Sequence, residues 1–256
     1  MVFRLEAACL CDTGRLRKNN EDNFYFNGQC LPVENRGLSH PLSGVFSPGK
    51  NAFFAVFDGM GGENYGEYAA FAAADCLRSL DGVQNGAADK AGLEELCLRL
   101  NDAVVETARK MSTGRMGATL AALSFTAGAV AVCNLGDSRA FRFRDGVFLQ
   151  LSVDHVSSRM GRSRAKAPLI QYLGIDPEEV VVEPYIAGEP LASGDWYLLC
   201  SDGLTDMLSN LEIVSILSRA DTAAGCAEEL VRAALDRGGR DNVTVITIRA
   251  EETREQ

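Results

Sequence analysis

The sequence predicts an α+β fold in which antiparallel β-sheets carry pairs of helices packed on their outside. The order of elements is the main observation: strands come first, then two helical segments, several strands, two more helices and a last strand. A parallel doubly wound sheet would show strands and helices in regular alternation. The 256 residues contain no internal repeat, low-complexity segment or interdomain linker. We therefore expect one domain over residues 1–256.

The N-terminal part is predicted to form strands around one long connection. Val2–Asp12 and Asn23–Asn27 have strand composition. Between residues 29 and 50, three prolines and several glycines indicate a loop insertion. The short apolar run at residues 52–57, AFFAVF, is typical of a strand buried on both faces, and it stops at Asp58.

Two helices and four strands are expected in the middle of the chain. Gly66–Leu80 is rich in alanine, and Leu93–Met111 places leucines three and four residues apart, so both segments favour helices. A polar break at 81–89 separates them, which suggests an antiparallel pair covering one sheet. The last two of the following strands are joined by an Asp-Gly hairpin signal. The four strands are Ala118–Phe125, Ala129–Leu135, Arg139–Arg144 and Val147–Leu151.

The C-terminal part again combines strands with a helix pair. Residues 154–168 are polar, basic and without pattern, so no regular element is predicted there. Ser209 and Glu212 form a capping-box pattern that opens a helix running to about Arg219. The other predicted elements are strands at Val180–Tyr185 and Trp196–Cys200, a helix at Thr222–Arg237 that two glycines end, and a last strand at Asn242–Ile248.

Composition limits the possible partners and the compartment. The chain has 25 Lys and Arg against 35 Asp and Glu, and the net charge of −10 argues against nucleic acid and against anionic membranes. Eight scattered cysteines form no zinc-type pairs and fit a reducing compartment. No signal-peptide pattern and no membrane-length apolar run is present. We expect a soluble cytoplasmic protein with no membrane partner.

Four acids share one local context, because each lies where an apolar strand meets a glycine-containing turn. In a β-sandwich, such strand ends can converge at one edge between the sheets. Carboxylate and carbonyl oxygens are the ligands that Mg²⁺ and Mn²⁺ prefer, and two such ions can activate water and screen a phosphoryl group. The chain has only two histidines, which nearly excludes a histidine site. We expect a metal site built from Asp58, Asp137, Asp202 and Asp241.

A turn role is the competing interpretation for these acids, because Asp-Gly is the commonest hairpin signal. It suits Asp145-Gly146, but helical sequence follows Asp58-Gly59 and Asp202-Gly203. For Asp241 alone, a cap or turn is as good an explanation as a metal ligand. Arg17 offers a planar fork to phosphate, although a solvated surface arginine is the commoner case.

Seven short motifs then occur in one order along nearly the whole chain. They are RKNNEDNF (17–24), VFDGMGG (56–62), GATL (117–120), NLGDSR (134–139), Asp154-His155, LLCSDGLTD (198–206) and GGRDNVTVI (238–246). With these motifs the chain resembles the metal-dependent serine/threonine protein phosphatases of type 2C, the PPM family, in their bacterial form. The resemblance implies a four-layer sandwich of two antiparallel sheets flanked by helix pairs, with two manganese or magnesium ions in a cleft at one end.

The resemblance also implies a role for each site residue. Asp58 would bridge the two ions and the carbonyl of Gly59 would bind one of them. Asp202 and Asp241 would bind the other. The remaining implied roles are water-mediated metal binding by Glu21 and Asp22, phosphate binding by Arg17, and a third, weaker metal site at Asp137 with Asp202.

The implied reaction is in-line attack on phosphoserine or phosphothreonine by a water that bridges the two ions. Phosphorylated proteins would be the substrates, a serine/threonine kinase would act on the same proteins, and the chain would act as a monomer. Two departures from the family pattern matter. Met60 stands where animal members carry a histidine general acid, which leaves a metal-bound water or His155 as proton donor. The segment 154–168 is a shortened flap.

Two other classes of function remain open on the sequence. A catalytically weak or inactive relative could serve as a binding or regulatory module, although such a protein would not need Asp58, Asp202 and Asp241 together. A nucleotide-binding enzyme is disfavoured, because the glycines after Asp58 lack the last glycine of GxGxxG and the order of elements is wrong.

Overall fold

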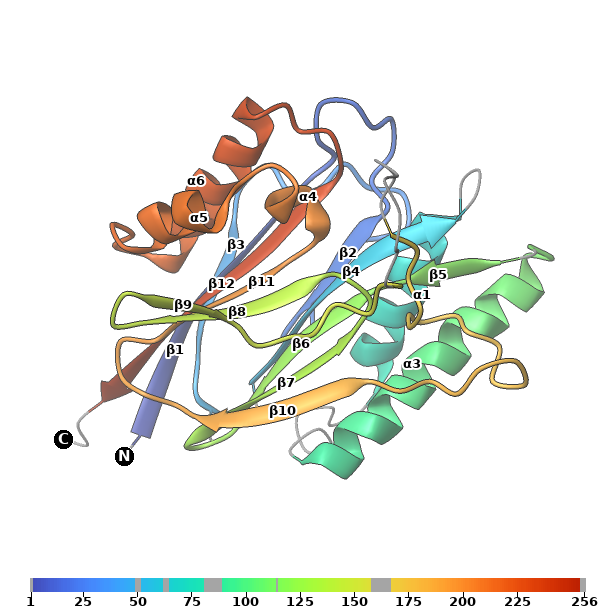
Figure 1. The fold of residues 1–256 in the computed structure, drawn as a ribbon, viewed down its shortest axis with the longest axis horizontal. Coiled ribbons are helices and arrows are strands. Elements are labelled where there is room, and N and C mark those ends of the chain that lie inside the picture. Colours follow the sequence, from blue (N-terminus) through green and yellow to red (C-terminus); the bar gives the residue numbers. More distant parts are fainter. Residues whose placement is uncertain are drawn as a thin grey trace.

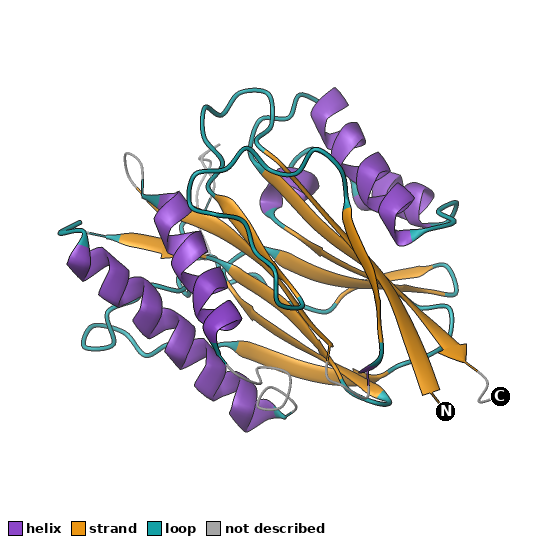
Figure 2. Ribbon diagram, turned by 180° about the vertical axis from the view of Figure 1, so that it is seen from behind, coloured by secondary structure: helices purple, strands orange, loops and turns teal. Residues whose placement is uncertain are grey.

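Two antiparallel β-sheets lie face to face, and helices cover the outer face of each, in the computed structural model of the chain (Figures 1 and 2). This arrangement is the predicted α+β sandwich. The first and last strands lie side by side, because they pair with each other. The structure describes residues 2–48, 52–61, 65–80, 89–113, 115–157 and 167–253.

The first sheet has six strands in the order β3-β1-β12-β11-β8-β9. Its centre is the long pair of β1 and β12, in which Val2 lies opposite Thr253 and Asp12 opposite Val243. The strands are β1 (Val2–Asp12), β3 (Leu42–Phe46), β8 (Arg139–Arg144), β9 (Val147–Gln150), β11 (Trp196–Cys200) and β12 (Val243–Thr253).

The second sheet has the order β10-β7-β6-β4-β2, and the short β5 pairs with the far end of β4. β4 therefore changes partner along its length: Ala52–Val56 pair with β6, and Gly59–Gly61 pair with β5. The strands are β2 (Asp22–Phe26), β4 (Ala52–Gly61), β5 (Met116–Ala118), β6 (Leu120–Phe125), β7 (Ala129–Leu135) and β10 (Tyr185–Pro190).

Helices form the two outer layers (Figure 2). The second sheet packs against α1 (Gly66–Ser79) and α3 (Lys90–Lys110), and the first sheet against α5 (Asn210–Leu217) and α6 (Ala223–Asp236). A one-turn helix, α4 (Asp202–Thr205), follows β11. Among the described residues, none of the helices combines the length and the apolar character that crossing a bilayer requires.

Strand alternation divides the core into three apolar layers. In β4, Phe53, Ala55 and Phe57 face the helices, whereas Phe54 and Val56 face the other sheet. This follows from the two-residue period of a strand, which sends successive side chains to opposite faces. Every residue of β4 from Ala52 to Phe57 is buried, as the continuous apolar run predicts.

Several local predictions are confirmed. Asp145 and Gly146 both have positive φ, 49° and 78°, as a two-residue type I′ hairpin requires. Ser209 and Glu212 exchange the two hydrogen bonds of a capping box. Gly238 and Gly239, with φ of 125° and 49°, end the last helix.

Three predictions are wrong in detail. The insertion 29–50 is not only a loop, because it contains edge strand β3. Residues 180–184 form no strand. The side chain of Gln171 binds the carbonyl of Val181 and the amide of Glu183, so these backbone groups are satisfied without a neighbouring strand. β4 also continues through Asp58 to Gly61, since β5 supplies a new partner there.

Two further predicted features fall partly outside the described residues. The polar break at 81–89 is described only at Asp89, which caps α3 by accepting a hydrogen bond from Gly92. Of the flap 154–168, residues 158–166 are not described. Its two ends lie against each other, with the amide of Ser157 donating to the carbonyl of Pro168 at 2.9 Å.

Candidate metal centre

Asp58 lies on the face of β4 that looks toward the other sheet. It has the same strand parity as Phe54 and Val56, whose side chains fill the layer between the sheets. Thr119 holds its backbone: the amide of Asp58 donates to Oγ1 of Thr119 at 3.0 Å, and the amide of Thr119 donates to the carbonyl of Asp58 at 2.9 Å. The half-buried carboxylate therefore projects from a fixed backbone at one end of the inter-sheet layer.

Asp22 lies directly opposite Asp58 in the pairing of β2 with β4. Directly opposed residues in an antiparallel pair point to the same face, with Cβ atoms about 5 Å apart. The Asp22 carboxylate is buried, and its Oδ2 accepts hydrogen bonds from Ser201 and Thr244, both at 2.7 Å. These two hydroxyls belong to the first sheet or its edge, so Asp22 joins the two sheets.

Burial raises the pKa of the Asp22 carboxyl to about 7, although the Thr244 and Ser201 hydroxyls oppose this rise. Its second oxygen, Oδ1, is buried and has no hydrogen-bond partner within the described part of the chain. A buried carboxylate oxygen of this kind is costly unless a donor or a cation satisfies it. The oxygen thus suits a hydrated or direct contact with a cation.

Asp202 and Asp241 come to the same end through a close contact between two turns. Asp202 begins α4 directly after Ser201, the partner of Asp22. A Cβ on Gly203 would lie only 1.9 Å from the carbonyl oxygen of Asn242, so only glycine lets these two segments approach so closely. Because Asn242 follows Asp241, the contact brings the two acids to neighbouring positions.

Asn242 is a site residue that the sequence analysis did not identify. Its side-chain oxygen accepts a hydrogen bond from the amide of Glu21 at 2.8 Å. Its side-chain nitrogen donates to the carbonyls of Thr13 and Asn19, at 2.8 and 3.0 Å. The asparagine thereby fixes the loop that carries Arg17 and Glu21. The sequence signal that could have identified Asn242 was its position in the GGRDN motif, directly after Asp241.

Arg17 and Asp241 form an ion pair at 2.7 Å. The pair raises the pKa of the Arg17 guanidinium, first through the hydrogen bond to Asp241, and the charges of Glu21 and Asp58 act in the same direction. The predicted phosphate-binding cation therefore lies within reach of three of the predicted acids. It is also paired with one of them.

Gly59 forms a narrow cradle beside Asp58. Its amide donates to the carbonyl of Glu21 at 3.1 Å. A Cβ there would lie 2.1 Å from the carbonyl oxygen of Gly66 and 2.5 Å from that of Glu21. Burial raises the pKa of the Glu21 carboxyl, and the positive charge of Arg17 opposes this shift. Backbone oxygens and carboxylates therefore crowd around the end of β4.

Asp137 lies next to a short hydrogen-bond chain that leads to Asp58. Thr119, which holds Asp58, lies 2.6 Å from the hydroxyl of Ser138. Gly136 has a φ of 97° and packs closely against Thr119. A Cβ atom added to Gly136 would lie 2.7 Å from Cγ2 of Thr119. The buried Asp137 lies between these two residues and is thus attached to the same strand ends.

His155 supports this turn through two hydrogen bonds with Gly136. Its Nδ1 accepts a hydrogen bond from the amide of Gly136 at 3.2 Å, and its own amide donates to the carbonyl of Gly136 at 2.9 Å. Burial lowers the pKa of the imidazole. A neutral ring whose Nδ1 is an acceptor fits a structural role beside Asp137, which makes His155 a poor general acid.

The donor set fits a hard divalent cation in the kind of its atoms. The functional atoms at this end are carboxylate and carbonyl oxygens, which Mg²⁺ and Mn²⁺ prefer. The buried Oδ1 of Asp22 and the glycine cradle fit the same interpretation. In the described ranges, however, no three His, Cys, Asp or Glu side chains form a ready-made metal cluster. The ion pair between Arg17 and Asp241 keeps one carboxylate engaged elsewhere.

The layered sandwich with an acidic end between its sheets is the arrangement that the motif resemblance implies. The chain belongs to the protein phosphatase 2C family, whose model matches residues 39–164 and 161–243. This finding agrees with the resemblance carried by the seven motifs.

Individual relatives agree with the family assignment. The chain is 30% identical over 254 residues to the serine/threonine protein phosphatase PstP of Mycobacterium tuberculosis, a match that covers 94% of this chain and 44% of PstP. The chain thus spans less than half the length of that relative. It is 29% identical to the serine/threonine phosphatase stp of Listeria innocua, with 93% of this chain and 92% of stp covered.

A solved structure extends the likeness to the fold. The catalytic domain of PstP in complex with two manganese ions superposes with a TM-score of 0.74 and 28% sequence identity, covering 98% of this chain and 100% of that one. Manganese, which the sequence predicts for this chain, is thus bound by a structural relative.

Proposed function

We propose that this chain hydrolyses phosphoserine and phosphothreonine in proteins, with two manganese or magnesium ions as cofactors, and that residues 1–256 act as one domain. The observation that carries the proposal is the convergence of Asp22, Asp58 and the Arg17–Asp241 pair at one end of the inter-sheet layer. The family and its named relatives support the same activity.

The residues divide into metal ligands and a phosphate ligand. Asp58 would bridge the two ions, and the carbonyl of Gly59 would bind one of them. Asp202 and Asp241 would hold the other ion, while Glu21 and Asp22 would act through water. Asp137, together with Asp202, would serve a third and weaker site.

When bound, the ions would supply Lewis-acid activation of water and screening of phosphoryl charge. The chain's own groups orient the reaction. Thr119 fixes Asp58 through two backbone hydrogen bonds, and Asn242 fixes the loop that presents Arg17. Arg17 would bind the phosphoryl oxygens through its planar fork. Met60 has no proton to give, so the residue set offers no side-chain acid at that position.

The cellular setting follows from the proposed activity. Phosphorylated proteins would be the substrates, and a serine/threonine kinase would act on the same proteins. We further propose a monomer in the cytoplasm that binds neither nucleic acid nor membranes, in line with the net charge of −10.

A binding or regulatory module without catalysis is the second candidate. The observation in its favour is the engagement of Asp241 by Arg17, which competes with metal binding. The two candidates differ in their response to metal ions.

The deciding experiment measures hydrolysis of an aryl phosphate and of phosphopeptides bearing phosphoserine, phosphothreonine or phosphotyrosine, with Mn²⁺, with Mg²⁺ and with excess EDTA. We expect turnover of the first two peptides only when a metal is added. Full activity in EDTA would refute the metal-dependent mechanism. Absence of turnover together with absence of ion binding by calorimetry would support the binding module.

A further inference from the structure

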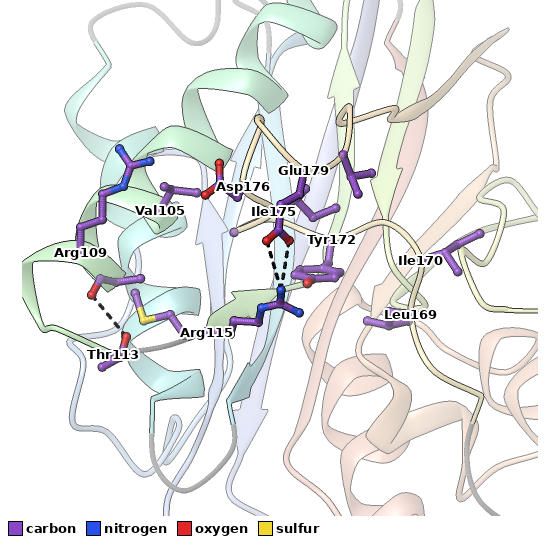
Figure 3. Close-up of a pocket in the computed structure, with 14 residues that line it drawn as sticks. Val105, Arg109, Thr113, Arg115, Leu169, Ile170, Tyr172, Ile175, Asp176 and Glu179 are labelled. Carbon is purple, nitrogen blue, oxygen red and sulfur yellow. Dashed lines mark hydrogen bonds and ion pairs between the residues drawn. The ribbon is translucent and has the colours of Figure 1, made fainter.

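A pocket with a volume of about 370 Å³ lies next to the candidate metal centre (Figure 3). Three elements enclose it: the C-terminal end of α3, strand β5, and the segment of residues 169–180. Figure 3 shows Arg109 on the helix side, Arg115 beside Tyr172, and Glu179 above Arg115. The mechanism proposed above uses none of these residues.

The walls of this pocket are held firmly by buried hydrogen bonds. The buried side chain of Asn101 accepts from the amides of Gly174 and Ile175, at 2.8 and 3.0 Å, and donates to the carbonyl of Ile175 at 2.9 Å. Leu173 and Ala118 exchange two backbone hydrogen bonds, at 2.8 and 2.9 Å. A pocket with fixed walls binds a ligand without first having to become ordered.

The pocket is one strand away from the end of β4, three residues beyond Asp58. Met116, which lines it, lies opposite Gly61 in the pairing of β5 with β4. Neighbouring strands are about 4.8 Å apart, and an extended peptide advances about 3.3 Å per residue. A substrate whose phosphorylated residue sits at the metal centre can therefore place a residue two to five positions away in this pocket.

The pocket combines apolar and charged residues. Ile170 and Val180 line it and are 53% and 46% exposed, and the next residue, Val181, is 70% exposed. Exposed aliphatic groups gathered at a pocket are typical of a binding surface. Two basic residues, Arg109 and Arg115, and two acidic residues, Asp176 and Glu179, also line it.

Arg109 and Arg115 can each meet an acidic group of a ligand. Arg109 forms no ion pair with any described residue. Arg115 pairs with Glu179 at 3.0 Å, but the two side chains are 80% and 62% exposed, so the pair is weak and can exchange. The other acid, Asp176, accepts a hydrogen bond from the amide of Glu178. A ligand carboxylate can thus replace Glu179 on Arg115 and also meet Arg109.

We propose that this pocket binds a segment of the phosphorylated substrate protein in which an aliphatic residue neighbours an acidic residue, two to five positions from the phosphorylated residue. The proposal rests on the proposed function and adds a specificity site to it. The aliphatic side chain occupies the surface of Ile170 and Val180, and the acidic one pairs with Arg115 and Arg109.

The test uses phosphoserine peptides in which a Leu-Asp pair, a Leu-Lys pair or Ala-Ala is moved through positions two to five on either side. We measure kcat/KM and divide each value by the same variant's rate on an aryl phosphate, which does not reach the pocket. We expect wild type to prefer Leu-Asp over Ala-Ala about tenfold on one side of the phosphoserine. The variant R109A/R115A should lose this preference, and Glu179→Gln should increase it.

A matched control and a binding assay complete the test. Arg99→Ala removes another α3 arginine, paired with Glu95 and outside the pocket, and should leave the preference unchanged. Fluorescence anisotropy of the same peptides in EDTA measures docking without turnover. Equal affinities for all peptides, a preference for Leu-Lys, or a preference that R109A/R115A retains would each overturn the pocket proposal. Loss of all hydrolysis with selective binding intact would instead count against the proposed function alone.

Discussion

The guanidinium of Arg17 lies 2.7 Å from the carboxylate of Asp241, although the two residues are predicted to serve different partners. Arg17 is the proposed phosphate ligand and Asp241 a proposed metal ligand. Both side chains are partly exposed, at 46% and 35%, so their pairing is weak. A divalent cation at Asp241 would compete with Arg17 for the carboxylate, which would free the guanidinium for a phosphoryl group. We therefore expect the proposed metal binding and phosphate binding to be coupled through this pair.

The first prediction separates these two roles. Arg17→Ala removes the competitor for Asp241, so Mn²⁺ should bind about two- to fivefold more tightly, the range of a surface ion pair. The same change removes a charged hydrogen bond to phosphate and should lower kcat/KM about ten- to hundredfold. Calorimetry and steady-state kinetics measure the two effects.

Arg15→Ala is the matched control for Arg17. Arg15 lies in the same loop and pairs with Asp236 at 3.5 Å, away from the acids. Arg15→Ala should change neither the Mn²⁺ affinity nor kcat/KM by more than about twofold. Weaker Mn²⁺ binding by Arg17→Ala would contradict the competition inferred from the pair.

The second prediction concerns Asp58. Asp58→Asn should lower turnover by about a thousandfold or more, because a bridging metal ligand is lost together with its several kcal/mol of charge stabilisation. The fold should persist, since the backbone of Asp58 stays bonded to Thr119. Thermal unfolding and turnover are compared with Asp145→Asn, a hairpin aspartate whose φ of 49° suits asparagine. An unfolded Asp58→Asn variant would show that Asp58 is a structural residue.

Strand and helix periodicity predicted the order of layers, because burial on one or both faces leaves a pattern in a short stretch of sequence. The extension of β4 to Gly61 could not be predicted in this way. Its glycines carry no pattern, and the partner β5 lies more than fifty residues away. The opposite error occurred at Val180 and Val181, where a strand was predicted and none forms. Valine favours strands, but these two side chains are exposed on the surface and their segment pairs with no described strand.

Asp58, Asp137, Asp202 and Asp241 could be singled out because junctions between apolar strands and glycine-containing turns are visible in the sequence. Their connections could not be. Asn242 and Thr119 act through backbone groups of residues far along the chain, and a polar residue alone does not reveal such contacts. The pairing of Arg17 with Asp241 depends on two loops that only the fold brings together.

The third prediction uses the pKa of Asp22, which burial raises to about 7. The folded state then binds a proton that the unfolded state has already released between about pH 4 and pH 7. Stability of the wild type in EDTA should fall as pH rises through this window, by about 1.4 kcal/mol per pH unit from this group. Asn cannot ionise, so the stability advantage of Asp22→Asn over wild type should grow up to pH 7 and then stay constant.

Chemical denaturation of both proteins at several pH values between 4 and 8.5 measures this difference. Other titrating groups are common to both proteins and largely cancel. A difference that is flat across the window would mean that Asp22 titrates normally. Saturating Mn²⁺ should reverse the advantage above pH 7, because Asp22→Asn loses a group that favours cation binding.

The fourth prediction concerns the glycine cradle. A Cβ at Gly59 would overlap the carbonyl oxygens of Gly66 and Glu21, so Gly59→Ala must displace backbone at the metal centre. We expect about 2–4 kcal/mol of destabilisation and loss of turnover. Gly128→Ala is the control, since no atom lies within 4 Å of its Cβ position, and it should change stability by less than about 0.5 kcal/mol. If Gly59→Ala and Gly128→Ala were equally stable, the backbone at the end of β4 could move aside at little cost in free energy.

The last prediction concerns Asn101, whose side chain makes three hydrogen bonds to Gly174 and Ile175. Asn101→Ala leaves two amides and one carbonyl unsatisfied near the core, which should cost about 3 kcal/mol. The loss should be local, because Leu173 stays bonded to Ala118. Hydrogen exchange should therefore speed up at Gly174 and Ile175 while the amides of β12 stay protected.

Asn210→Ala, at the exposed start of α5, is the control. It should change the free energy of unfolding by less than about 0.5 kcal/mol and leave hydrogen exchange at Gly174 and Ile175 unchanged. If Asn101 builds the pocket by fixing its wall, Asn101→Ala should also abolish the Leu-Asp preference while aryl phosphate hydrolysis continues. Unchanged exchange at Gly174 would mean that the wall is held by the β5 pairing alone. The pocket would then owe its shape to the two backbone hydrogen bonds between Leu173 and Ala118, which Asn101→Ala leaves in place.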